Sequence, residues 1–66
     1  MNELSYLISY EKESLDSKFG ELARRYGRYS QRETKEGIVY EIEFDNPNTI
    51  EKFKDIIKSE IPNLYI

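Results

Sequence analysis

The chain has 66 residues, a net charge of −3 and neither cysteine nor histidine. This length allows one domain with a small core, residues 1–66, and the missing residue types exclude disulfides and the usual ligands of zinc, haem and iron–sulfur clusters. No apolar stretch approaches the roughly 20 residues that span a bilayer, and the N-terminus lacks a signal-peptide pattern, so we expect a cytoplasmic protein without membrane contact.

The N-terminal half predicts a strand followed by an amphipathic helix. Branched and aromatic residues dominate positions 4–11, and Leu7 adds an apolar side chain to the second face, which favours a central strand. An apolar stripe at helical spacing then runs through residues 15–26. Ser14 is the predicted N-cap of this helix, and we expect Gly27 to end it in the left-handed conformation.

Residues 29–34 and 38–45 predict a β-hairpin with a turn at Gly37. The second of these strands has the clearest period-two pattern in the chain: an apolar set of side chains alternates with a set that is acidic apart from Val39, which gives the strand two different faces. We expect its apolar face to lie under helices; this face consists of Ile38, Tyr40, Ile42 and Phe44. The acidic side chains Glu41 and Glu43 should then point to an uncovered face.

A second helix and a short last strand complete the predicted pattern. Asn48 and Glu51 resemble a capping box, and the helix should end near Glu60, because Pro62 disfavours helical backbone at the preceding residue. Residues 63–66 are short and apolar enough for an edge strand. The resulting order is that of the ferredoxin-like βαββαβ fold, an α+β domain with a four-stranded antiparallel sheet and two helices on one face. Its first and third strands would lie in the middle.

All four arginines of the chain lie within nine residues, interleaved with two tyrosines. A guanidinium beside an aromatic ring suits phosphates and exposed bases, so this stretch is a candidate binding site for nucleic acid or for an acidic protein surface. We call it the arginine segment and define it by the side chains Arg24, Arg25, Arg28, Tyr29 and Arg32.

The alternative is that these arginines stabilise the fold. Arg24 and Arg25 oppose the negative end of the helix dipole, at about 0.3–1 kcal/mol each, and Glu21 can pair with either of them for about 0.2–0.5 kcal/mol. Arginine on an edge strand also discourages edge-to-edge association, which suits Arg32. Neither Arg28 nor Arg32 lies well inside the helix, so the dipole does not explain them.

A second candidate is the acidic row, which we define as Glu11, Glu41, Glu43 and Asp45. The last three follow one another along one predicted strand, and Glu11 ends the strand expected beside it. Two or three convergent carboxylates would suit Mg²⁺, but we favour a solvated sheet face and predict no metal and no other cofactor. Without histidine, a glycine-rich elbow or a phosphate loop, we predict no catalytic residues and no enzymatic activity.

The stretches at residues 6–11, 26–27 and 30–31 resemble the small CRISPR-associated adaptation nucleases and the related virulence-associated protein D toxins. In that family an acidic residue at the end of the first strand is implicated in metal binding, and the matching residue is Glu11. Glutamate replaces the family's aspartate there, and the chain is shorter and more acidic than those relatives, so nuclease activity is not carried over. The resemblance implies homodimerisation through sheet edges.

We therefore expect a small non-enzymatic interaction module, a regulator or inhibitor of the kind that phages encode, which binds a protein partner through charged surfaces. The alternative is a nucleic-acid-binding or metal-dependent nuclease-like protein that uses the arginine segment. A thin core and exposed sheet edges also predict a homodimer.

Overall fold

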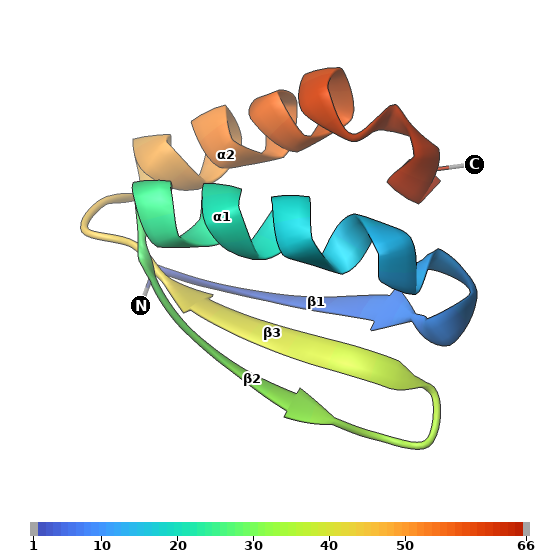
Figure 1. Cartoon of the computed structure of the whole chain (residues 1–66). Helices are drawn as coiled ribbons and strands as arrows, with labels where there is room; N and C mark the ends of the chain where they lie inside the picture. The colour runs from blue at the N-terminus through green and yellow to red at the C-terminus, as the bar shows by residue number, and fades with distance from the viewer. Residues whose placement is uncertain (1, 66) are drawn as a thin grey trace.

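The chain folds into one antiparallel sheet that two helices cover on one side (Figure 1). The computed structural model describes residues 2–65, apart from the side chain of Tyr65. In chain order the elements are β1 (Glu3–Ser9), the 3₁₀ helix η1 (Tyr10–Leu15), α1 (Asp16–Tyr26), β2 (Arg28–Glu33), β3 (Gly37–Glu43), α2 (Pro47–Glu60) and the 3₁₀ helix η2 (Pro62–Tyr65). The predicted α+β class is confirmed. Within residues 2–65, neither helix has the length and hydrophobicity of a membrane span.

The predicted four-stranded ferredoxin-like fold is wrong, because the described chain forms a sheet of three strands in the order β1-β3-β2. Residues 62–65 form η2 where an edge strand was predicted, and Ile66 lies outside the described residues. Leu64 is buried against the core, and its carbonyl oxygen accepts a hydrogen bond from Lys12 Nζ at 3.1 Å. This end of the chain is therefore held beside η1, and β1 is an edge strand instead of a central one.

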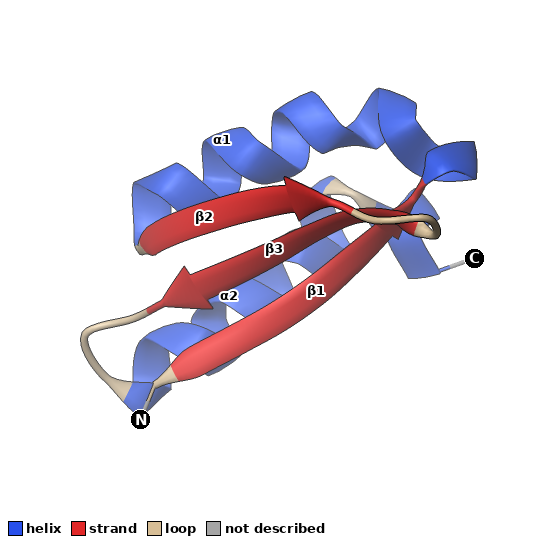
Figure 2. Ribbon diagram, turned by 90° about the horizontal axis from the view of Figure 1, so that it is seen from below, coloured by secondary structure: helices blue, strands red, loops and turns tan. Residues whose placement is uncertain are grey.

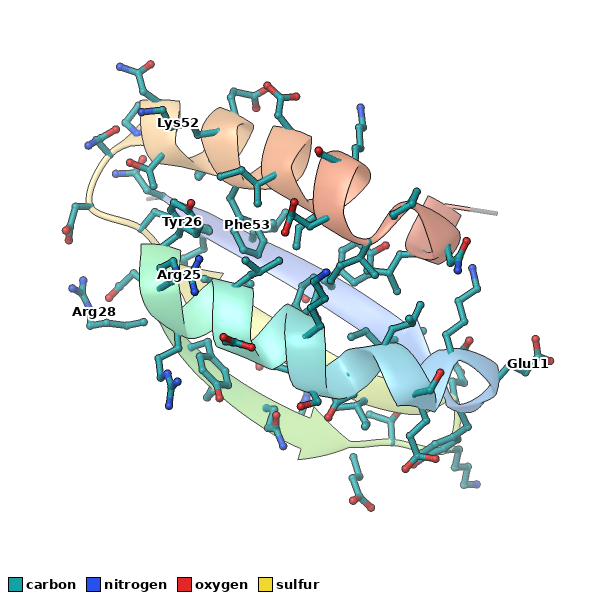
Figure 3. All side chains as sticks on the ribbon, turned by 45° about the horizontal axis from the view of Figure 1, so that its top comes forward. Glu11, Arg25, Tyr26, Arg28, Lys52 and Phe53 are labelled. Carbon is teal, nitrogen blue, oxygen red and sulfur yellow. The ribbon has the colours of Figure 1, made fainter. Side chains whose placement is uncertain are left out.

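Aromatic rings form the centre of the core between the sheet and the helices. Phe19 of α1 is fully buried, and its ring centroid lies 4.8 Å from that of Tyr40 and 5.7 Å from that of Phe53. Figure 3 shows Phe53 between the two helices, near Tyr26. The residues predicted to lie under the helices are all buried, namely Ile38, Tyr40, Ile42 and Phe44.

The starts of the two helices differ from the predicted caps. Ser14 does not cap α1, because it lies inside η1, which leads directly into that helix. At α2 the N-cap is Asn46, not Asn48: its Oδ1 accepts a hydrogen bond from the backbone N–H of Thr49 at 3.1 Å. Pro47 then occupies the first turn, where its missing N–H leaves no helical hydrogen bond unmade.

Gly27 follows α1 as predicted, but its backbone is extended, with φ −162° and ψ −168°. A Cβ atom at this position would lie 2.7 Å from the backbone oxygen of Glu43. Glycine is therefore required here because the backbone of residue 27 lies too close to β3 for a side chain. A left-handed backbone conformation is not the reason. Positive φ occurs instead at Gly37, at +155°, where the predicted hairpin turn is confirmed and Thr34 Oγ1 accepts a hydrogen bond from the Gly37 N–H.

The face of the sheet that lies opposite the helices is uncovered (Figure 2). The register of the three strands sets its side chains in rows that cross the sheet. Glu41 and Glu43 are both exposed there, as predicted. We call this surface the open face and define it by three rows: Glu3, Glu43 and Arg28; Ser5, Glu41 and Ser30; Leu7, Val39 and Arg32.

Candidate functional site

The arginine segment is divided between the two sides of the sheet. Successive side chains of a strand point to opposite faces, so Arg28 and Arg32 lie on the open face, whereas Tyr29 lies on the side of the helices. The ring of Tyr29 packs 5.4 Å from that of Tyr40, and 38% of the residue is exposed. Tyr29 therefore does not form one surface with Arg28 and Arg32.

Arg28 is hydrogen-bonded to two carboxylates of the acidic row. Its Nη2 and Nε donate to Glu43 Oε1 at 2.9 and 3.3 Å, and its Nη1 donates to Asp45 Oδ1 at 3.3 Å. The hydrogen bonds to Glu43 and then to Asp45 raise the pKa of the Arg28 guanidinium above its usual value. The three groups thus form a charged cluster whose guanidinium is held in position by two partners.

Two of the other arginines also lie near carboxylates. Arg32 Nε is 3.9 Å from Glu41 Oε1 on the open face. Arg25 Nη2 is 3.7 Å from Glu21 Oε1, one helical turn earlier on α1, which is one of the two pairings that the sequence predicts for Glu21. Three of the four arginines therefore have a carboxylate of the same chain within 4.0 Å, namely Arg25, Arg28 and Arg32.

Arg24 makes no ion pair with the residues that the structure describes. It lines a cleft of about 330 Å³ between α1 and β2, together with Tyr29 and Gln31. The carboxylates Asp16 and Glu21 line the same cleft, so its charge is mixed. This cleft does not have the concentration of positive charge that a phosphate site requires.

Glu11 is separated from the rest of the acidic row. It lies in η1, and Figure 3 shows it at the opposite end of the molecule from Arg28. Among residues 2–65, no three carboxylates come close enough together to hold a metal ion. Glu43 and Asp45 instead accept hydrogen bonds from the guanidinium of Arg28.

A partly buried hydrogen bond between β3 and the start of α1 was not predicted. Tyr40 Oη donates to Asp16 Oδ1 at 2.6 Å, at the base of the cleft between α1 and β2. Burial, and then the hydrogen bond to Asp16, raise the pKa of Tyr40 far above its usual value. The available signal was a tyrosine on the apolar face of a strand, because a buried tyrosine hydroxyl needs a polar partner.

The open face contains a shallow depression of about 580 Å³ near the Arg28 end of the sheet. Side chains of both charges surround it, including Glu3, Glu41 and Glu43 with Arg28. Further along the face, Leu7 is 44% exposed and lies opposite Val39 in the register. The surface therefore combines positioned charges with a small apolar area, and no helix of the described chain covers it (Figure 2).

Comparison with known proteins indicates no function for this chain, so a proposal has to be argued from the arrangement of its residues. No family model matches the chain, and no curated protein or solved structure matches it significantly. The resemblance to the CRISPR-associated adaptation nucleases and virulence-associated protein D toxins therefore stays a prediction. The sheet of three strands departs from the fold that this resemblance implies, and the matched acidic residue, Glu11, lies in η1 instead of ending β1.

Proposed function

We propose that the chain is a non-enzymatic interaction module, a regulator or inhibitor, which binds a protein partner through the open face of its sheet. The observation that supports this most is the hydrogen bonding of Arg28 to Glu43 and Asp45. A surface with positioned charges of both signs, next to the exposed Leu7, has the character of a protein–protein interface. Its charge pattern selects partners by complementarity.

The partner should present a basic surface. Arg28 and Arg32 are outnumbered on and beside the open face by carboxylates, namely Glu3, Glu41, Glu43 and Asp45. A negative surface attracts a positively charged partner and speeds its association. We infer that the module covers a basic patch on its target, of the kind that proteins use to hold nucleic acid.

Binding of nucleic acid by the chain itself has less support. Affinity for a phosphate backbone comes from cations that are free to replace its counterions, whereas Arg28 and Arg32 lie 2.9 and 3.9 Å from carboxylate oxygens. A phosphate that approached the open face would have to displace Glu43 or Glu41 and would meet their negative charge. Of the remaining candidates, Arg25 lies 3.7 Å from a carboxylate oxygen of Glu21, and Arg24 and Tyr29 line a cleft of mixed charge.

Affinity capture with charge-reversed variants tests the proposal. The wild-type protein is compared with Glu41→Lys/Glu43→Lys on the open face and with Glu13→Lys/Asp55→Lys, which changes the net charge equally at exposed positions elsewhere. Each immobilised protein is incubated with lysate of the source organism, both untreated and treated with nuclease, and the retained proteins are quantified.

We expect a partner that the wild type and the Glu13→Lys/Asp55→Lys control retain at least about tenfold better than the open-face variant, which corresponds to about 1.4 kcal/mol of binding free energy. Equal retention by all three proteins would show that the open face is not the binding surface. Retention that disappears on nuclease treatment, or no retained protein at all, would contradict the proposal.

A further inference from the structure

An apolar groove runs along the outer edge of β1, on the side of the sheet that the helices cover. It has a volume of about 220 Å³. Its lining is apolar except for two exposed lysines of α2. We call it the β1 groove and define it by its lining residues: Leu4, Tyr6, Phe19, Phe53, Lys54, Ile57 and Lys58.

The backbone of β1 has unpaired hydrogen-bonding groups along this edge. The N–H of Phe44 donates to the carbonyl oxygen of Asn2 at 2.7 Å. In the antiparallel register, the even-numbered residues of β1 therefore turn their backbone groups toward β3. The N–H and C=O groups of Glu3, Ser5 and Leu7 point the other way, where no strand of the described chain pairs with them.

The two edges of the sheet differ in their protection against an added strand. Proteins block exposed edges with charged side chains, proline or bulges. The edge strand β2 carries Arg28, Arg32 and Glu33 among its six residues. β1 carries Glu3 as the one charged residue among seven, contains no proline and pairs with β3 without a bulge. β1 is therefore the edge that can accept a strand.

The end of the described chain does not occupy this edge. Residues 62–65 form η2, in which Leu64 is buried and its carbonyl oxygen is bound by Lys12. These residues would have supplied the fourth strand of a ferredoxin-like sheet. An extended polypeptide segment would suit this edge, because the exposed N–H and C=O groups of a strand edge are matched by an extended backbone.

We propose that the β1 groove binds an extended acidic segment of a partner protein, which adds to the sheet as a fourth strand. Its backbone hydrogen-bonds to Glu3, Ser5 and Leu7, and one of its alternate side chains enters between Tyr6 and Phe53. The groove is smaller than the roughly 300–1,000 Å³ of pockets for drug-sized ligands, so it suits one or two side chains and not a cofactor.

The acidic character of the segment follows from the two lysines that line the groove. Lys58 makes no ion pair with the residues that the structure describes, and the pairing of Lys54 is with Glu51, at 3.5 Å on the exposed side of α2. A carboxylate on the bound segment would complement both ammonium groups. The inference rests on the proposed function, because it also treats the chain as a protein-binding module. It concerns the β1 groove and not the open face, so the two proposals can fail separately.

Selection of short random peptides displayed against the immobilised full chain tests the inference without knowledge of the partner. Enriched peptides are measured against wild type, Lys54→Glu/Lys58→Glu, Ser5→Pro, the open-face variant Glu41→Lys/Glu43→Lys and a control that reverses two lysines elsewhere, Lys35→Glu/Lys52→Glu. Lys52 lies about 200° around the α2 axis from Lys54. The N–H of Ser5 points away from β3, so proline there blocks an added strand and keeps the existing ladder.

We expect enriched peptides that alternate apolar with polar residues and carry net negative charge. They should bind wild type, the lysine control and Glu41→Lys/Glu43→Lys alike, and bind Lys54→Glu/Lys58→Glu and Ser5→Pro at least about tenfold more weakly. If circular dichroism shows that Ser5→Pro is unfolded, the lysine variant decides.

Three results would overturn the inference: no enrichment, enriched peptides that bind every variant equally, or a wild-type dimer in light scattering that Ser5→Pro dissociates, which would assign the edge to a second copy of the chain. Because the selection needs no lysate, and because its decisive variants change the β1 groove and not the open face, its failure leaves the capture experiment unaffected.

Discussion

Arg28 on β2 and Glu43 on β3 face each other directly across the open face, and two guanidinium nitrogens of Arg28 donate to one carboxylate oxygen of Glu43, at 2.9 and 3.3 Å. Asp45 accepts from the third nitrogen. From the sequence, the helix dipole does not explain Arg28, which made it a candidate for binding. In the structure it is instead the centre of an ion-paired cluster. It offsets the negative charge of β3 and orders the surface that we propose as the interface.

A double-mutant cycle on Arg28 and Glu43 measures whether this contact exists in solution. Arg28→Ala and Glu43→Ala should each lower the free energy of unfolding slightly, and the double variant should lose less than the two losses together. Because both groups are exposed, the coupling should be small and should decrease as salt is added. Strictly additive losses in urea denaturation at low salt would contradict the pairing.

The N-cap of α2 is Asn46 in the structure, whereas the sequence predicts Asn48, and two alanine variants distinguish the two positions. Asn46→Ala should destabilise the protein by about 0.5–2 kcal/mol, because it removes the acceptor for the N–H of Thr49. Asn48→Ala, at the cap predicted from the sequence, is the matched control and should change stability by less than about 0.5 kcal/mol. Chemical denaturation checks both, and a larger loss for Asn48→Ala would show that α2 starts later.

Gly27→Ala tests the close approach of the chain to β3. The extended backbone of Gly27 is available to any residue, so the cost is steric: the new Cβ would lie 2.7 Å from the Glu43 backbone oxygen. We expect a loss of about 1–3 kcal/mol, or roughly 4–8 °C in Tm per kcal/mol. An unchanged or raised Tm would mean that glycine at this position has no packing role.

Tyr40→Phe tests the partly buried hydrogen bond between β3 and α1. Removal of the hydroxyl leaves Asp16 without its donor and should cost about 1 kcal/mol near neutral pH. Burial and the bond to Asp16 raise the pKa of Tyr40 in the folded state. The stability linked to this raised pKa is complete below the unfolded pKa of about 10 and is lost as the pH rises above it.

The wild type should therefore lose stability above about pH 10 more steeply than Tyr40→Phe does. Urea denaturation of both proteins between about pH 8 and pH 11 measures this difference, and the titration of lysines cancels between them. Parallel curves would show that Tyr40 ionises in the folded protein as readily as in the unfolded chain.

The periodicity of apolar residues was sufficient to predict both helices and the strands β1 and β3, since burial on one face leaves a direct trace in the sequence. The six residues of β2 are all exposed, and this strand was predicted as a polar strand from its place before the hairpin turn. The end of the chain left no such trace. Residues 63–66 are too few to show a period, and the position of Leu64 depends on a contact with Lys12, 52 residues away in the sequence. Because that strand is not formed by the described residues, β1 lies at the edge of the sheet and not in its centre, where it was predicted.

The candidate site was predicted in composition but not in arrangement. A hairpin turn at residues 35–36 fixes the antiparallel register and sets Arg28 opposite Glu43. This contact could therefore have been predicted from the sequence. Alternation along β2 likewise separates Tyr29 from Arg28. The position of Glu11 was not accessible, because the 3₁₀ turn that removes it from the sheet depends on how η1 packs.

Whether Arg28 and Arg32 belong to an ion-paired sheet face or to a nucleic-acid interface is decided most directly by fluorescence anisotropy with short single- and double-stranded oligonucleotides at low salt. We predict no binding stronger than the non-specific range of about 10⁻⁴–10⁻⁶ M, and no difference between wild type and Arg28→Ala/Arg32→Ala. Tighter binding that weakens steeply with salt and is lost in the double variant would contradict the conclusion that Arg28 and Arg32 serve as ion-paired residues of the open face.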